Sequence, residues 1–294
     1  MEPEFVASFW TLAGNSHPRE CNGISVLPLE VRAEAAAAAG FRGFSFVNTD
    51  LAAVREIPRW QQYSDIRRLL DSLDLRFVEL ELITDWFTTG QRKIASDKVR
   101  DLLFEAAVEL GAHHIKVIGD LGSQCPLAQM VDGFGAMCRA AEKTGAKIGI
   151  ELTPLTNLFT PEQGLNLVRA SGASNAGLFL DVWHMGRAGI PLDSLDQIPA
   201  NMIIGIELDD ADLEVCGTLM HDTMTHRRLP GQGKLEPARL IAAVNRAGYR
   251  GFYGVEIVSD EHRARPVEEA ARVAIQTARS QFPFKRQLPT ERAS

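Results

Sequence analysis

Short apolar segments of strand length recur eight times along the chain, and most are separated by longer segments with helical spacing. The apolar segments are residues 5–12, 41–47, 75–83, 113–118, 146–152, 176–182, 202–208 and 252–258. Apolar residues spaced three and four positions apart predict helices over residues 29–39, 66–73, 95–110, 127–144, 161–170, 235–247 and 267–281. Strands that alternate with helices in this way predict an α/β protein with a parallel sheet.

Glycine directly follows most of these helices, just before the next strand, at positions 40, 111, 145, 172 and 248. Glycine is common there because it adopts the left-handed conformation that ends many helices. Eight strand-then-helix units predict a single-domain (β/α)₈ TIM barrel over residues 1–283, a fold that commonly uses about 250 residues. A doubly wound open sheet is the alternative, but no G-x-G-x-x-G motif follows the first strand. The polar segment 284–294 is predicted to be a C-terminal tail.

The composition is that of an ordinary globular domain, with 45% hydrophobic and 23% charged residues. No apolar run approaches the roughly 20 residues of a membrane span, and the N-terminus lacks the basic segment of a secretory signal. The four cysteines (Cys21, Cys125, Cys138 and Cys216) show no C-x-x-C spacing and predict reduced thiols in a cytoplasmic protein. A net charge of −7 argues against a generic nucleic-acid binder.

Acidic residues stand at the ends of several predicted strands. Glu151 closes the fifth strand, Asp181 the sixth and Glu256 the eighth, and Glu207 lies within the seventh. A carboxylate in a buried strand is costly unless it is paired or binds a cation. In a barrel, the carboxyl ends of the strands form the active face. We therefore expect a divalent metal, with Mn²⁺ or Mg²⁺ favoured by the oxygen ligands and Zn²⁺ or Co²⁺ left open.

Four strings in this order carry a resemblance to a known family: IELTP at 150–154, LDVWH at 180–184, RRLPGQG at 227–233 and YGVEI at 253–257. Over nearly its whole length the chain resembles the xylose-isomerase-like TIM barrels, often called sugar phosphate isomerases/epimerases. That superfamily also contains ketose 3-epimerases, dehydratases, nucleases and lyases. The resemblance implies a divalent metal held at Glu151, Asp181, Glu207 and Glu256. Glu207 departs from the pattern, because the family usually has a neutral ligand there.

Other side chains are candidates for substrate binding: His184, Arg227, Trp10, Trp86 and Lys116. We expect His184 on a turn just beyond strand six, and the turn at 230–233 should bring Arg227 inward. Trp10 and Trp86 would stack on a sugar ring from the ends of strands one and three.

Each candidate also has a structural alternative. Lys116 would neutralise Glu151 and Glu256 as barrel-lining acids, Asp181 would cap the following turn, and Glu207 would pair with Arg227 or Arg228. His184 would pack beside Trp183, and both tryptophans would serve packing alone. Glu79 and Glu81 share a face of strand three and either reach the site or form salt bridges. His221 and His226 lie in a polar loop and are expected to be exposed.

Two carboxylates beside a metal predict proton transfer next to a carbonyl. Glu151 and Glu256 would remove and return the proton, and His184 or Arg227 would stabilise an enediolate. The sequence thus predicts a metal-dependent sugar or keto-sugar isomerase/epimerase. The alternative is a lyase or dehydratase on a keto-sugar, 3-keto-glycoside or cyclitol-type ring. A repair nuclease and a non-catalytic scaffold are further alternatives. We expect a small carbohydrate-like substrate, no nucleic acid and no membrane; a homo-oligomer is left open.

Overall fold

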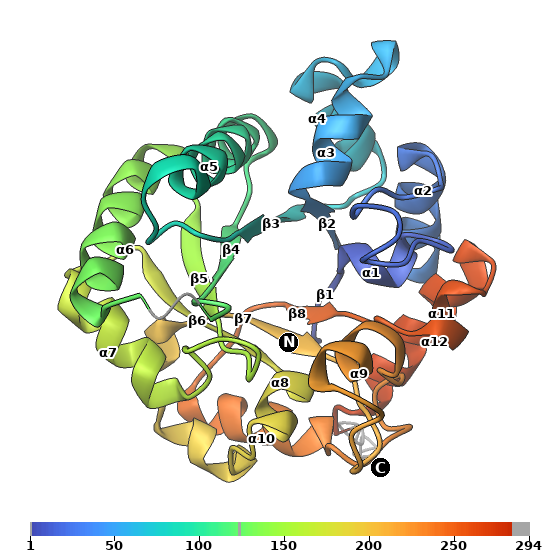
Figure 1. Ribbon diagram of the computed structural model, residues 1–294. Helices are drawn as coiled ribbons and strands as arrows, with labels where there is room; N and C mark the ends of the chain where they lie inside the picture. Colours follow the sequence, from blue (N-terminus) through green and yellow to red (C-terminus); the bar gives the residue numbers. More distant parts are fainter. Residues whose placement is uncertain (1, 123–124, 284–294) are drawn as a thin grey trace, which may run out of the picture.

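Eight parallel strands close into a barrel in the order in which they occur along the chain (Figure 1). The computed structural model describes residues 2–122 and 125–283, so the predicted tail at 284–294 lies outside the described residues. The strands are β1 (Phe5–Ala7), β2 (Gly43–Val47), β3 (Phe77–Ile83), β4 (His114–Ile118), β5 (Lys147–Glu151), β6 (Ala176–Asp181), β7 (Ile203–Leu208) and β8 (Tyr253–Val255). Because β1 pairs with both β2 and β8, no strand edge is left open, and the predicted (β/α)₈ barrel is confirmed.

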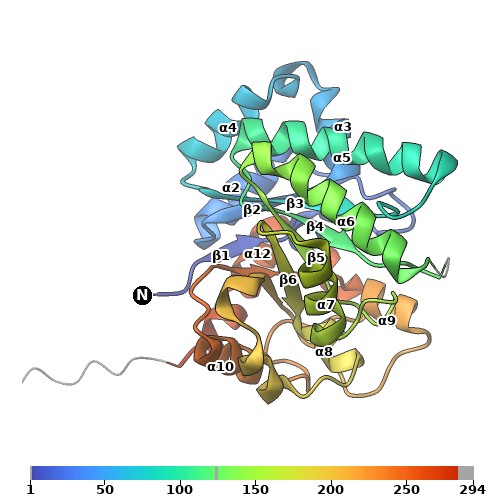
Figure 2. The same cartoon turned by 90° about the vertical axis from the view of Figure 1, so that its left-hand side faces the viewer.

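Helices surround the barrel (Figures 1 and 2). The predicted ones are α2 (Leu29–Ala39), α4 (Tyr63–Ser72), α5 (Gly90–Leu110), α6 (Leu127–Ala141), α7 (Pro161–Ser171), α10 (Pro237–Ala247) and α12 (Val267–Ser280). Short helices that the sequence did not predict are α1 (Phe9–Leu12), α3 (Asn48–Arg55), α8 (Val182–Arg187), α9 (Leu219–Thr225) and α11 (Asp260–Arg263). Four 3₁₀ helices are η1 (Pro58–Trp60), η2 (Glu142–Thr144), η3 (Leu192–Gln197) and η4 (Ala200–Met202). None of the helices in the described residues has the length and apolar character of a membrane span.

The five glycines predicted to end helices all have positive φ, from 63° at Gly111 to 101° at Gly40. Each of them therefore occupies the left-handed cap conformation that the sequence predicted.

Alternation along the strands divides the buried residues into two sets. On β4, Ile115 and Val117 belong to the apolar core between the sheet and the helices. His114 and Lys116 are equally buried, but they lie inside the barrel, where Lys116 reaches Glu207 on β7. The interior of the barrel therefore holds charged groups together with apolar side chains such as Phe179 beside Lys116, and most of the apolar core lies outside it.

Two predicted strands are shorter than expected. The segment 5–12 forms a strand only over Phe5–Ala7, and α1 begins after Ser8. The chain turns there because Thr11 donates from Oγ1 to the carbonyl of Val255, 2.7 Å away, which holds α1 across the end of β8. The eighth strand ends at Val255, so Glu256 lies directly beyond it. Because both strands end early, polar side chains lie at the carboxyl end of the barrel.

Candidate active site and metal centre

The register of the barrel brings the predicted metal ligands to one place. Asp181 of β6 lies opposite Glu207 of β7, which in turn lies opposite Gly254 of β8. Glu151 closes β5 and Glu256 follows β8. One oxygen from each of Glu151, Asp181, Glu207 and Glu256 lies within 4.8 Å of the others, and all four side chains are buried. We call these four residues the acid cluster.

Glu207 is the member that departs from the family pattern, and both of its oxygens have partners. Lys116 Nζ lies 2.9 Å from Oε1 and 3.0 Å from Oε2, and Ser8 donates from Oγ to Oε1 at 2.7 Å. Gly254 leaves the room for this arrangement, because a Cβ there would lie 2.8 Å from Glu207 Cγ. Ser8 was missed in the sequence because the segment around it was predicted as strand.

Lys116 is buried among carboxylates. Besides Glu207, its ammonium lies 2.6 Å from Glu81 and 3.7 Å from Glu256. Burial alone would lower the pKa of Lys116, but the surrounding glutamates hold it well above its ordinary value. Burial raises the pKa of Glu81 to about 8, even though Lys116 opposes the shift. Lys116 was predicted to bind substrate, with neutralisation of the barrel acids as the alternative. Its contacts with the carboxylates favour the alternative role.

Arg227 is a second buried cation at the cluster. Its Nη1 lies 2.8 Å from Asp181, 2.7 Å from Asp209 and 2.9 Å from Glu256. It approaches from the loop after α9, and the predicted turn at 230–233 follows it in the same loop. The carboxylate of Asp210 holds this loop by accepting the backbone amides of Ala211, Gly231, Gly233 and Leu235. Asp209 and Asp210 were seen in the sequence only as acids after strand seven, and no sequence signal separates their roles.

His184 lies in the first turn of α8, directly beyond β6, where the sequence predicted a turn. Asp181 caps this helix by accepting the His184 amide at 2.8 Å, and Asp209 accepts the Trp183 amide at 2.8 Å. His184 Nε2 lies 3.6 Å from Glu151, and its ring packs against Trp183. Within the described residues, the buried Nδ1 of His184 has no hydrogen-bond partner. An imidazole nitrogen in this position is free to contact a ligand.

The two carboxylates predicted to transfer protons have different environments. Burial pushes the pKa of Glu151 upward, but Lys116, His184 and Arg227 outweigh it and lower the pKa to about 2. Burial raises the pKa of Glu256 above its ordinary value, and Lys116 and Arg227 only partly offset the shift. Glu151 therefore favours the ionised form, whereas Glu256 retains a proton more readily.

Both tryptophans that were predicted to stack on a sugar make packing contacts. Trp86 is 3% exposed, packs against Phe134 and donates its indole hydrogen to the carbonyl of Ile118. This burial assigns Trp86 to packing and leaves it little surface for a sugar. Trp10, on α1, is half-buried and packs edge-on against Phe9.

Glu79 and Glu81 share the inner face of β3 as predicted: Glu79 lies 2.8 Å from His114, and Glu81 pairs with Lys116.

The acid cluster fits a divalent cation, since carboxylate oxygens are the donors that Mg²⁺ and Mn²⁺ prefer. The buried Lys116 and Arg227 add positive charge beside these carboxylates, although Lys116 also pairs with Glu81 and Arg227 with Asp209. The two cations therefore offset part of the excess charge that Glu207 introduces.

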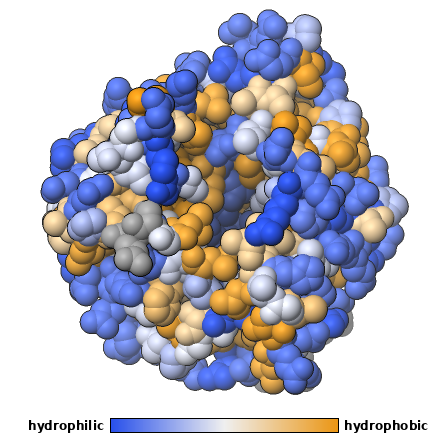
Figure 3. Space-filling view, viewed as in Figure 1, coloured by the Kyte–Doolittle hydropathy of each residue, from blue (hydrophilic) through white to orange (hydrophobic). Residues whose placement is uncertain are grey.

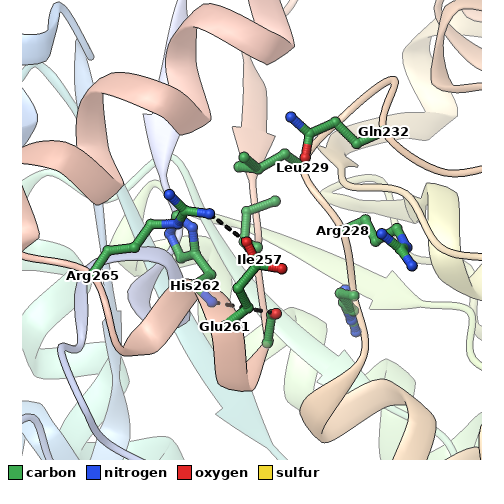
Figure 4. Close-up of a pocket in the computed structure, with 9 residues that line it drawn as sticks. Arg228, Leu229, Gln232, Ile257, Glu261, His262 and Arg265 are labelled. Atoms are coloured by element: carbon green, nitrogen blue, oxygen red, sulfur yellow. Dashed lines mark hydrogen bonds and ion pairs between the residues drawn. The ribbon is translucent and has the colours of Figure 1, made fainter.

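A pocket lies between the loop after α9 and the segment after β8 (Figure 4); Arg227 lines it, but no member of the acid cluster does. Arg228 and Arg265 line it, and each has an acidic partner: Arg228 pairs with Asp212 at 2.6 Å and Arg265 with Glu261 at 2.5 Å. The face of the molecule seen in Figure 3 is hollowed near its centre, where hydrophilic residues lie deep in the hollow. The mouth of the barrel is therefore polar.

Comparison with known proteins places the chain in a family. The sequence pattern described as xylose isomerase-like TIM barrel matches residues 33–279. The chain is 29% identical over 248 residues to 3-dehydroshikimate dehydratase of Pseudomonas aeruginosa, covering 83% of this chain and 38% of the relative. It is 30% identical over 149 residues to inosose isomerase of Bacillus subtilis, covering 50% of this chain and 52% of the relative. The chain thus spans about half or less of these curated relatives.

A solved structure of similar fold is that of the IolI protein with a bound zinc atom. It matches with a TM-score of 0.80 at 19% sequence identity, and the match covers 95% of this chain and 97% of that one. At this identity the likeness shows the fold alone. Because the family pattern spans most of a closed eight-stranded barrel, the chain belongs to the xylose isomerase-like TIM barrel family.

Proposed function

We propose that the protein is a divalent-metal-dependent isomerase or epimerase that acts on a sugar or keto-sugar through an enediolate. The observation that carries the proposal is the convergence of four buried carboxylate oxygens within 4.8 Å at the ends of four barrel strands. Ionised carboxylates at this separation repel one another unless cations lie among them. Mn²⁺ or Mg²⁺ suits the oxygen donors of Glu151, Asp181, Glu256 and, as the fourth ligand, Glu207; Zn²⁺ or Co²⁺ is the alternative.

A bound divalent ion supplies Lewis acidity, which makes the C–H next to a substrate carbonyl more acidic. Glu151 acts as the base, and His184 beside it orients the carboxylate. Glu256 returns the proton from the other side of the site, since its raised pKa lets it hold one. Arg227 and His184 stabilise the negative oxygen of the enediolate. Trp10 flanks the substrate.

Elimination is the second candidate. The same enediolate expels a leaving group on the adjacent carbon, which would make the protein a lyase or dehydratase. Similarity to a dehydratase over 248 residues of this chain supports this outcome. Similarity to an inosose isomerase over 149 residues supports the first one.

The substrate class that the site favours is a neutral polyhydroxylated compound. Exposed acids follow β7 at Asp212 and Glu214, and their negative charge repels a phosphate dianion. Arg228 and Arg265 in the adjacent pocket, and Arg263 beside it, each have an acidic partner already. Little uncompensated positive charge is therefore left for an anion, although phosphate sites in barrels commonly lie in this region.

The experiment is a metabolite screen with metal-loaded and chelated protein in deuterated water, followed by mass spectrometry. An isomerase or epimerase yields a product that has taken up solvent deuterium, whereas a dehydratase yields a product lighter by one water. Elemental analysis of protein purified without chelator should find near-stoichiometric divalent metal. Turnover that survives exhaustive chelation would contradict the metal-dependent mechanism.

A further inference from the structure

Three metal-binding side chains meet on the surface, away from the acid cluster. Cys216 precedes α9, His221 lies in this helix and His226 directly follows it. The thiol of Cys216 and one ring nitrogen from each histidine all lie within 4.8 Å of one another, and the three residues are exposed. The two imidazole rings have their centroids 5.0 Å apart. The histidines are exposed as predicted, but the sequence did not predict that they would meet a cysteine.

The backbone beneath these side chains is fixed by its own hydrogen bonds. The amide of Cys216 donates to Asp222 Oδ1 at 2.8 Å, and the amide of His221 donates to Thr218 Oγ1 at 3.1 Å. Asp222 is itself anchored, because its Oδ2 accepts from Trp183 Nε1 and Arg187 Nε, each at 2.9 Å. The ends of α9 are thus held in place before any ion binds.

The histidine rings are also oriented. Nδ1 of His226 lies 2.5 Å from Thr225 Oγ1, which leaves Nε2 as the nitrogen for a ligand. Gly217 has φ +70°, and a Cβ there would lie 3.2 Å from the His221 ring. The glycine therefore lets the chain turn between Cys216 and α9 while the ring lies close above it.

We propose that Cys216, His221 and His226 bind one zinc ion, with water as the fourth ligand. A thiolate and two imidazoles form a donor set that zinc prefers, at roughly 2.3 Å for sulfur and 2.0 Å for nitrogen. The exposed side chains need only small rotations to reach these distances. The acid cluster offers oxygen atoms instead, so the two sites differ in the metals that they select.

Zinc at this site connects the beginning and the end of α9. His226 directly precedes Arg227, whose guanidinium contacts Asp181, Asp209 and Glu256. His226 also forms an isolated β-bridge with Ser259. A bound ion therefore stiffens the segment that carries Arg227 into the acid cluster.

Co²⁺ serves as the probe, because Co²⁺ bound to a thiolate shows a charge-transfer absorption band that Co²⁺ bound only to carboxylates lacks. Metal-free full-length protein is titrated with Co²⁺ in the presence of excess Mn²⁺, which occupies the oxygen-rich cluster. We expect a thiolate-to-cobalt band that saturates at one equivalent and disappears when Zn²⁺ is added. Cys216→Ser should abolish the band, and His221→Asn or His226→Asn should weaken it. Cys125→Ser is the matched control, because Cys125 is half-buried and distant in sequence, and it should leave the band unchanged.

Alkylation gives an independent measurement. Iodoacetamide should label Cys216 readily in metal-free protein, and Zn²⁺ should suppress this labelling without protecting Cys21 or Cys125. The site is refuted if the band is absent, if it persists in Cys216→Ser, or if Zn²⁺ leaves the labelling of Cys216 unchanged. These outcomes do not depend on turnover, so they are separate from those that test the proposed enzyme activity.

Discussion

The ammonium nitrogen of Lys116 lies 2.9 Å from Oε1 and 3.0 Å from Oε2 of Glu207, and neither side chain is exposed to solvent. The two residues come from β4 and β7, which are 91 positions apart in sequence. Removing one partner of such a buried pair leaves an uncompensated charge in a region of low polarity. The pair therefore affects both the charge of the acid cluster and the stability of the barrel.

The variant Lys116→Met should destabilise the fold by about 3 to 5 kcal/mol, as is typical when one partner of a buried ion pair is lost. The free energy of unfolding is measured by urea denaturation. The double variant Lys116→Met/Glu207→Gln should recover part of this loss, because the neutral amide no longer needs a cation. Lys147→Met is the control, since Lys147 is exposed at the start of β5. Equal stability of the Lys116 and Lys147 variants would count against the role of the pair.

Glu207 and Glu256 should differ in their effects on metal and turnover. Glu207→Gln should retain the metal, because an amide oxygen still coordinates and the crowding of charge falls. Glu256→Gln should abolish turnover even where metal remains, because an amide cannot hold a proton and return it to the substrate. Elemental analysis measures the metal content of each variant, and turnover is measured with the identified substrate. Complete loss of metal in both variants would overturn this division of roles.

Sugars should bind more tightly than their phosphates to the metal-loaded protein. The reason is that the exposed Asp212 and Glu214 follow β7, while Arg263 and Arg265 are engaged by nearby acids. Calorimetric competition between matched pairs of sugar and sugar phosphate measures the preference. Tighter binding by the phosphates, weakened by Arg265→Glu, would refute the assignment of a neutral substrate.

The buried His262 should make the fold less stable in mild acid. Burial lowers its pKa to about 4, and the hydrogen bond with the carbonyl of Thr11 opposes this only in part. Between the ordinary pKa of about 6.5 and pH 4, the unfolded chain takes up a proton that the folded protein does not. The contribution is therefore complete above about pH 6.5 and is lost as the pH falls toward 4, by at most about 1.4 kcal/mol per pH unit.

Urea denaturation at pH 7 and pH 5 checks this expectation. His262→Gln should show a flatter dependence of the unfolding free energy on pH, whatever its stability at pH 7. His17→Gln, a change in a half-exposed loop, should keep the original slope. Parallel profiles for the original protein and His262→Gln would rule out His262 as a source of the pH dependence.

The fold was predictable because apolar periodicity and helix-ending glycines repeat along the chain. The eight strands and seven major helices lie close to the predicted segments. The errors have local causes. The segment 5–12 is apolar throughout, and pattern alone does not show that Ser8 ends the strand and that Thr11 bonds across to Val255. The short helices α8, α9 and α11 begin with local caps, in which Asp181, Thr218 and Ser259 each accept an amide three residues later. Helices of four to seven residues are too short for an apolar period to show in the sequence.

The acids of the candidate site were visible because each stands at a strand end, where a barrel gathers its functional groups. The residues that pair with these acids were harder to predict. Lys116 reaches Glu207 across the barrel, and Ser8 reaches it from β1, so neither contact leaves a spacing signal in the sequence. The contacts of Arg227 with three carboxylates depend on the loop held by Asp210, and no periodic pattern encodes such a loop.

Arg227 has a consequence for attempts to re-engineer the protein. Its guanidinium joins the ends of β6, β7 and β8 through Asp181, Asp209 and Glu256, although it belongs to a connecting loop. Loops of barrels are usually treated as parts that can be exchanged between relatives without disturbing the framework. Here a transplanted loop that lacks this arginine would expose the framework's own acids to mutual repulsion. The loop, Arg227 and Asp209 would therefore have to be transplanted as one unit.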